Sequence, residues 1–168
     1  MAGAAQTTPM ILTEPTLCFK KNFLIKNAEI VNEGDLVGMD TNGFVVVASK
    51  TAGSIIKALG VAFFEGNNST ITSRTGDGTT QRCSIARYGL MLNANTTLVP
   101  GLAKGAPVYL GPVPTSTVSN YTCNLTSTNG DAIQQVGWVS DDGTTLEIFV
   151  VEAGLKYQTA GNSTVTFA

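Results

Sequence analysis

Short apolar runs separated by clusters of Gly, Asn and Asp dominate this chain. The clearest example is Leu36-Val37-Gly38-Met39, followed by the polar stretch Asp40-Thr41-Asn42-Gly43 and the apolar run Phe44-Val45-Val46-Val47-Ala48. An Asn-Gly pair between two apolar runs predicts a tight β-hairpin, because Asn and Gly both tolerate the positive φ that such a turn needs.

Further apolar runs predict strands along the rest of the chain. Residues 23–31 have strand character, residues 59–64 are typical of a buried strand, and residues 49–58 fit either a short helix or an irregular loop. Two more hairpins are predicted. Gly76-Asp77-Gly78 would join residues 69–74 to a return strand over 82–92, and Asp141-Asp142-Gly143 would join residues 133–139 to 145–151.

Some of these strands recur in the same order. Gly34-Asp35-Leu36-Val37 matches Gly105-Ala106-Pro107-Val108, residues 56–62 match 133–139, and residues 82–86 match 146–150. This ordered repeat predicts an all-β fold, a small barrel or sandwich built of two similar hairpin units. Pro107 lacks a backbone N–H, so its strand should begin there or lie at an edge.

The chain divides into three predicted parts. Residues 1–22 form an extended N-terminal arm, residues 23–152 a β-rich core with a Pro, Ser and Thr-rich insertion at 111–129, and residues 153–168 a polar C-terminal tail. Pro9 and Pro15 favour extended geometry in the arm. The arm also carries several apolar residues, so we expect it to dock either on the sheet of its own chain or on a neighbouring subunit.

The strand predicted over 145–151 is apolar on both faces, with Leu146, Ile148 and Val150 on one face and Phe149 and Val151 on the other. A half-exposed strand should be polar on one side. The second apolar face is therefore either covered by the arm or the 111–129 loop, or it is a subunit interface, which we favour. The candidate capsid or subunit contacts are Met10, Ile11, Leu12, Leu17, Phe19, Lys20, Lys21, Phe44, Val46, Phe149 and Val151.

Composition adds to this picture. Only 13% of residues are charged, against a typical ~25%, whereas threonine alone occurs 23 times. This balance favours strands and turns, and it fits a surface that is partly covered or one solvated by hydroxyl and amide groups. The net charge of −2 and the lack of a basic stripe argue against nucleic-acid binding. No apolar run reaches the ~20 residues of a membrane span, and no signal peptide is recognisable.

Catalytic chemistry has little support in the sequence. The chain has no histidine, and Cys18, Cys83 and Cys123 lack the spacing of a zinc site or a disulfide framework, so we expect three reduced thiols. Acidic pairs such as Asp141-Asp142 fit turns better than an acid/base pair. We therefore expect no enzyme activity and no catalytic, metal or cofactor residues. Trp138, next to Gly137 in a strand, is expected to pack in the core.

The ordered glycine and valine motifs over residues 30–152 resemble those of tailed-bacteriophage capsid decoration proteins, also called cement or head-stabilising proteins. They run from Gly34-Asp35-Leu36-Val37 and Leu59-Gly60-Val61-Ala62 through Gly105-Ala106-Pro107-Val108 to Val136-Gly137-Trp138-Val139. The longer arm, the 111–129 insertion and the tail depart from the family's pattern.

The resemblance implies a small β-rich structural protein of the virion. Such a protein would be made in the cytoplasm of the host bacterium, would sit on the outer capsid surface as a homotrimer, and would stabilise the capsid by cross-linking neighbouring major capsid proteins. Its partners would be the major capsid protein and itself. The alternative is a glycan- or receptor-binding β-module of a virion fibre. A hydrolase that uses carboxylates is the weakest of the three interpretations.

Overall fold

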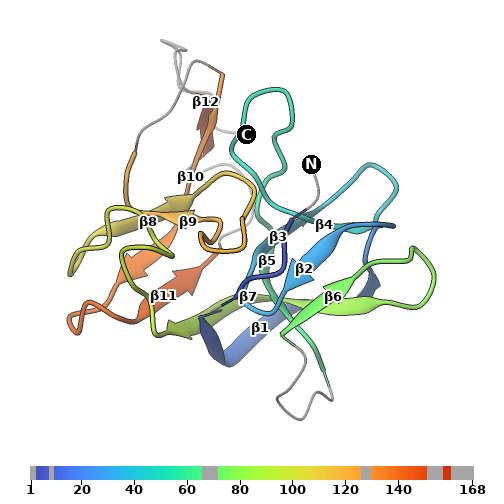
Figure 1. Ribbon diagram of the computed structural model, residues 1–168, viewed down its shortest axis with the longest axis horizontal. Helices are drawn as coiled ribbons and strands as arrows, with labels where there is room; N and C mark the ends of the chain where they lie inside the picture. Colours follow the sequence, from blue (N-terminus) through green and yellow to red (C-terminus); the bar gives the residue numbers. More distant parts are fainter. Residues whose placement is uncertain (1–2, 8–9, 66–71, 126–129, 151–156, 160–168) are drawn as a thin grey trace.

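A computed structural model describes residues 3–7, 10–65, 72–125, 130–150 and 157–159, with the side chains of 14–21 and 157–159 left aside (Figure 1). The chain is all-β, and the described residues contain no helix. The strands in the described ranges are β1 (Ile11–Leu24), β2 (Ile30–Asn32), β3 (Leu36–Met39), β4 (Val45–Val47), β5 (Gly60–Phe63), β6 (Ser73–Thr75), β7 (Arg82–Leu92), β8 (Pro107–Leu110), β9 (Tyr121–Thr122), β10 (Ala132–Val139), β11 (Leu146–Phe149) and β12 (Tyr157–Thr159).

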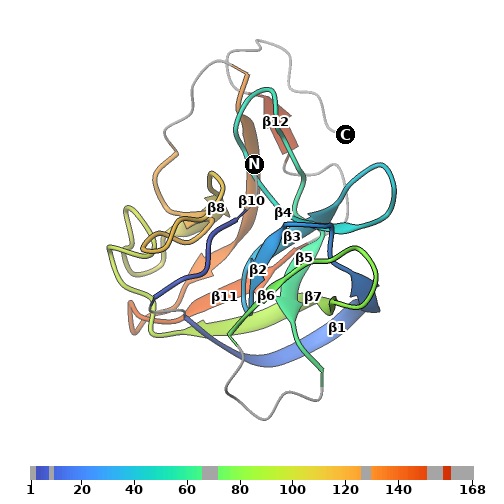
Figure 2. The same ribbon diagram turned by 45° about the vertical axis from the view of Figure 1, so that its right-hand side comes forward.

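A strongly curled, antiparallel sheet holds most of these strands, in the order β4-β3-β5-β7-β11-β10-β8-β9. Strand β1 runs along β7, strand β12 pairs with β10, and β2 and β6 form a separate pair. Figures 1 and 2 show β8, β10 and β11 on one side of the molecule and β2, β3 and β6 on the other, with β7 running between them.

The strand order confirms two similar units. The first unit is β4-β3-β5 with the start of β7, and the second is β9-β8-β10 with β11, in mirrored order. Val37 faces Gly60 in the first unit, and Val108 faces Gly137 in the second, as the matched sequence motifs require. Strand β8 begins at Pro107, as its missing N–H predicts.

The third match of the repeat is wrong by three residues. Val61 of the first unit faces Ala86, and Trp138 of the second unit faces Glu147. Ala86 therefore corresponds to Glu147, whereas the sequence comparison aligned it with Val150. The comparison matched apolar residues, but the side chains of β7 and β11 have different surroundings, so equivalent backbone positions carry different residue types.

The first and third hairpins are confirmed. Val37 faces Val47 across the turn at 40–43, and Val139 faces Leu146 across the turn at 141–143. In the first turn, the Asp40 carboxylate accepts hydrogen bonds from the backbone N–H groups of Asn42 and Phe44 at 2.9 and 3.0 Å. Gly43 has the positive φ, 83°, that the turn needs.

The second hairpin is wrong, because β6 pairs with β2 and not with β7. The Gly76 N–H donates to the Glu29 carbonyl at 2.7 Å, which holds this turn against the segment before β2. Residues 23–31 are also not one strand: β1 ends at Leu24, and Ala28 turns the chain with a φ of 62° before β2 begins. Residues 49–58 form the irregular loop, not the helix, of the two alternatives.

The N-terminal segment docks on the sheet of its own chain. Strand β1 pairs with β7 from Ile11, which faces Leu92, to Leu24, which faces Arg82. The register shifts between Thr13 and Thr16, on either side of Pro15, which has no N–H to donate to the ladder. The predicted arm of residues 1–22 thus includes most of a strand of the core sheet.

Two buried clusters stabilise the fold. The larger one packs Leu36 and Val61 of the first unit against Val108, Leu146 and Ile148 of the second. The smaller one lies on the other face of the first unit and contains Ile25, Val31, Val37, Val45 and Ile85, among others. The first unit is therefore buried on both faces, whereas the second contributes one face to the larger cluster.

Candidate interaction surface

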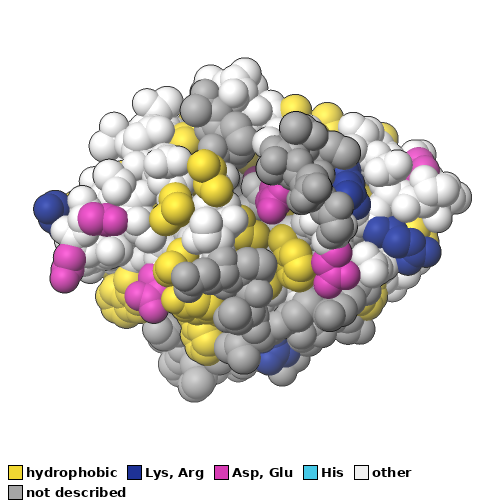
Figure 3. All heavy atoms as spheres, turned by 90° about the horizontal axis from the view of Figure 1, so that it is seen from below, with side chains coloured by type: hydrophobic (Ala, Val, Ile, Leu, Met, Phe, Trp, Pro, Cys, Tyr) yellow, Lys and Arg dark blue, Asp and Glu magenta, His cyan; other side chains and the backbone are white. Residues whose placement is uncertain are grey.

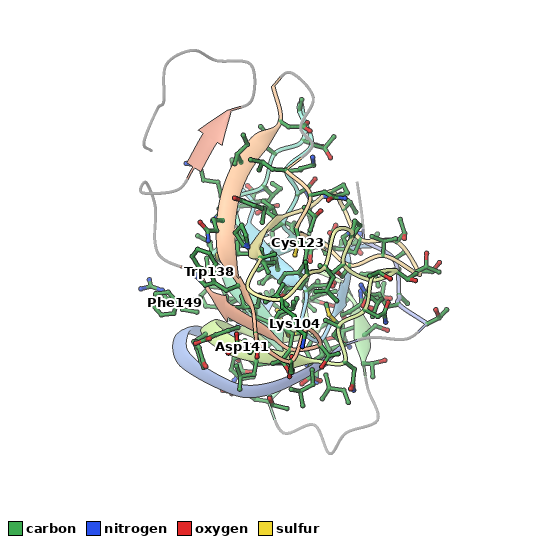
Figure 4. All side chains as sticks on the ribbon, turned by 90° about the vertical axis from the view of Figure 1, so that its left-hand side faces the viewer. Lys104, Cys123, Trp138, Asp141 and Phe149 are labelled. Carbon is green, nitrogen blue, oxygen red and sulfur yellow. The ribbon has the colours of Figure 1, made fainter. Side chains whose placement is uncertain are left out.

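The second unit carries exposed aromatic residues on the face that points away from the larger cluster. Residues that face one another in a sheet share a side, so Trp138 lies beside Glu147, and Phe149 lies beside Tyr88 on the same side. Trp138 and Phe149 are 49% and 47% exposed. In Figure 4 both side chains project from β10 and β11 away from the body of the protein.

The same side of the sheet continues across β7 to β1. Thr13 of β1 faces Leu90 of β7, and Ile11, two residues earlier on the same side, is 52% exposed. Leu90 and Tyr88 are half-buried. We call this continuous surface the outer face, and its members are Ile11, Tyr88, Leu90, Trp138, Glu147 and Phe149.

A comparison of the two units shows how unusual the outer face is. Val61 and Ala86 occupy the positions equivalent to Trp138 and Glu147, and both are fully buried. The second unit itself covers that face of the first unit. Large apolar residues that remain exposed together on a sheet are typical of interaction sites. Seen from below, exposed hydrophobic atoms interspersed with acidic ones gather on the side of the molecule that holds β8, β10 and β11 (Figure 3).

The predicted contact residues divide into three groups. Phe149 and Ile11 lie exposed on the outer face, as an interface requires. Met10 and Val46 are only 4% and 6% exposed, so they offer little surface for a contact, and Leu12 and Phe44 are half-buried. The side chains of Leu17, Phe19, Lys20 and Lys21 lie outside the described part of the structure, as does Val151.

Trp138 is exposed, so the expectation that it packs in the core is wrong. The neighbouring Gly137 has no side chain to mark which face of the strand is buried. A Cβ atom on Gly137 would collide with the Glu147 carbonyl oxygen of β11, so the glycine is needed for the close approach of two strands. The sequence signal for the exposure of Trp138 is the alternation Leu146-Glu147-Ile148-Phe149 in the paired strand. The exposed Glu147 lies on one face of that strand, and Trp138 faces Glu147.

Buried amide side chains, for which the sequence carries no signal, hold the scaffold behind the outer face. The fully buried Asn120 accepts a hydrogen bond from the Leu36 N–H at 3.1 Å and donates to the carbonyls of Leu36 and Ala48 at 2.7 and 3.1 Å. Gln134 of β10 pairs in the same way with both backbone groups of Ala58, at 2.9 Å each. These amides join the second unit to the first, so the sheet that carries the outer face is rigidly supported.

A third buried amide anchors the N-terminal segment. The Asn32 side chain accepts a hydrogen bond from the Gln6 N–H and donates to the Ala4 carbonyl, both at 3.0 Å. It also donates to the Asp35 carboxylate at 2.9 Å. Burial raises the pKa of Asp35 to about 7, although the hydrogen bonds from Asn32 oppose this shift.

The described residues offer little for catalysis or metal binding. They include no group of three or more His, Cys, Asp or Glu side chains that could hold a metal ion. Cys83 and Cys123 are free thiols, and burial raises the pKa of both, to about 12 for Cys83. A raised pKa leaves less of the reactive thiolate. No helix in the described ranges is long and apolar enough to cross a membrane.

Comparisons with known proteins leave the family open: no protein-family model matches the chain, and no curated protein matches it.

Proposed function

We propose that this chain is a structural virion protein that binds the outer surface of a phage capsid and stabilises it by cross-linking neighbouring major capsid proteins. The observation that carries the proposal is the outer face, where Trp138, Phe149 and Ile11 are each about half exposed on a rigid sheet. The proposal also rests on the order of the sequence motifs and on the low content of charged residues.

The mechanism would be mechanical. Covering exposed apolar area contributes roughly 25 cal/mol per Å², so two or three aromatic and aliphatic side chains supply the centre of a modest contact. Many copies bound symmetrically to one particle gain avidity, and no single contact needs to be strong. A homotrimer would present three such faces, and its attachment to several capsid subunits would raise the cost of separating them.

The experiment combines two measurements on one pair of variants. The protein is co-expressed with the major capsid protein of the same phage genome, and particles are sedimented. Light scattering gives the mass of the free protein. We expect a trimer that sediments with the particles in a simple ratio to the capsid protein. The variant Trp138→Ser/Phe149→Ser should lose at least one of these properties, whereas Asp142→Asn, at an exposed hairpin tip, should keep both.

The outcomes assign the role of the outer face. Loss of the trimer makes it a contact between copies, and loss of sedimentation with an intact trimer makes it the capsid contact. A wild-type monomer that never sediments with particles would refute the proposal. Far-ultraviolet circular dichroism of the double variant separates loss of contact from loss of folding.

The second candidate function is a glycan- or receptor-binding module of a virion fibre, and the exposed Trp138 favours it. An exposed aromatic ring on the same side of the sheet as Phe149 and Tyr88 is a suitable platform for the apolar face of a sugar. Saturable quenching of Trp138 fluorescence by a glycan from an array screen would support this function, and an array without hits would count against it.

A further inference from the structure

A cavity of about 320 Å³ lies on the first unit, away from the outer face. It is bounded by the turn after β1, by β4, by the irregular loop between β4 and β5, which Figure 2 shows beside β12 and β4, and by Val113 of the segment between β8 and β9. Val47 and Ile56 are among its apolar lining residues, and its polar lining comes from Lys26, Glu29, Asp40, Ser49 and Ser54. This volume falls in the lower range of ligand cavities, ~300–1,000 Å³.

Glu29 is the unusual member of this lining. It is only 7% exposed, and one of its carboxylate oxygens, Oε1, accepts a hydrogen bond from the Val47 N–H at 3.0 Å. Among the described residues, no hydrogen bond reaches its second oxygen, Oε2, and this oxygen is not one of the fully enclosed polar atoms that lack a partner, so it is open to the cavity. The carboxylate as a whole has lost most of its contact with water, which favours a cationic partner. The side chain thus offers an unused acceptor at the wall of the cavity.

The other charges of the cavity compensate one another. Lys26 Nζ lies 3.5 Å from Asp40 Oδ2, and the second oxygen of Asp40 accepts the two backbone hydrogen bonds of its turn. Glu29 therefore leaves one negative charge without a counterion in the cavity. An anionic ligand would be repelled, and a single available carboxylate is too few for Ca²⁺, which takes six to eight oxygen ligands.

We propose that this cavity binds one alkyl cation, an ammonium or guanidinium group carried on a short methylene chain. The cationic group donates to Glu29 Oε2 and to the hydroxyls of Ser49 and Ser54, while the methylene chain lies against Val47 and Ile56. The side chain of an arginine or lysine on a partner protein and a free aliphatic diamine share this chemistry. The site does not depend on the capsid role, because it shares no residue with the outer face.

The test is a nuclear magnetic resonance titration with butylguanidinium chloride, with butylurea as the uncharged probe of the same shape. We expect saturable shifts of the Val47 and Ile56 amides with the cation and none with butylurea. Glu29→Gln keeps an oxygen for the Val47 N–H but removes the charge, so binding should weaken at least about tenfold. Glu147→Gln, on the outer face, should bind the cation like the wild type.

Absence of saturable shifts would overturn the proposal, as would an equal response to butylurea or unchanged binding to the Glu29→Gln variant. If that variant does not fold, the wild-type comparison of the two probes decides. Two further titrations then identify the source of the cation. Tighter binding of acetyl-Gly-Arg-Gly-amide indicates a protein side chain, and tighter binding of butane-1,4-diamine indicates a free diamine; failure of both would also overturn the proposal.

Discussion

The buried carboxyl of Asp35 should make the protein less stable as the pH rises. Burial raises its pKa in the folded state from an ordinary value of 3.8 to about 7. The titratable groups that face it are Glu29, whose carboxylate raises the pKa of Asp35 further, and Tyr121, whose hydroxyl stays protonated and uncharged because burial raises its pKa. Between the two pKa values of Asp35, the folded state holds a proton that the unfolded chain has released.

The sign and size of the change in the free energy of unfolding with pH follow from proton linkage. The folded state binds more protons than the unfolded state between about pH 4 and pH 7, so the free energy of unfolding falls with rising pH in this window. A pKa difference of about three units corresponds to about 4 kcal/mol in total, or about 1.4 kcal/mol per pH unit. Stability contributed by the protonated carboxyl is complete below about pH 4 and is lost as the pH passes through 7.

Urea unfolding at half-unit steps from pH 4 to pH 8.5 measures this effect. Subtracting the free energies of the Asp35→Asn variant isolates the carboxyl from other groups, such as Asp142, whose hydrogen bonds lower its pKa and give the opposite trend at lower pH. We expect the difference between wild type and variant to change by about 4 kcal/mol across the window. A difference that is flat to within about 1 kcal/mol would refute the argument and would mean that Asn32 stabilises a charged Asp35 in the folded protein.

Other predictions concern the scaffold. Asn120→Ala removes the acceptor of the buried Leu36 N–H and should lower the free energy of unfolding by about 3 kcal/mol in urea titrations, against less than about 1 kcal/mol for Asn42→Ala at an exposed turn. Gly137→Ala places a methyl group against the Glu147 carbonyl and should cost about 1–3 kcal/mol in the same assay; no change would mean that β10 and β11 separate easily. Deletion of residues 1–22 removes most of β1 and uncovers β7, so circular dichroism should show loss of the cooperative thermal transition, whereas a core that still melts cooperatively would show that β1 is dispensable.

Local turn chemistry and the repeat made much of the fold predictable. The turns at 40–43 and 141–143 carry their own signal, because Asp accepts the backbone N–H groups of the turn and Gly supplies the positive φ. The matches of Val37 with Val108 and of Gly60 with Gly137 predicted the two units, because glycine is needed where strands approach closely. These features depend on neighbours in sequence or on backbone geometry.

The parts that could not be predicted depend on long-range pairing. The turn at Gly76-Asp77-Gly78 looks like a hairpin turn, yet its strand pairs with β2, more than forty residues earlier in the chain. Asn120 lies in a polar loop and gives no sign in the sequence that it bonds to Leu36, 84 residues away. In the same way, alternation shows that a strand has two faces but not which face the rest of the chain covers, so the sequence alone predicts a core position for Trp138.

The difference between the two units is the strongest argument that the outer face is a contact surface. Equivalent backbone positions hold Val61 and Ala86 where a neighbouring layer covers the sheet, and Trp138 and Glu147 where the ring is half exposed. If the exposed face of the second unit had only to face water, polar residues such as Glu147 would be sufficient at every position on it. Such residues would also keep the protein more soluble. A tryptophan and a phenylalanine instead leave large apolar surface exposed on a sheet that buried amide side chains hold in place. That arrangement favours association over solubility, because aromatic side chains contribute most when a partner buries them completely.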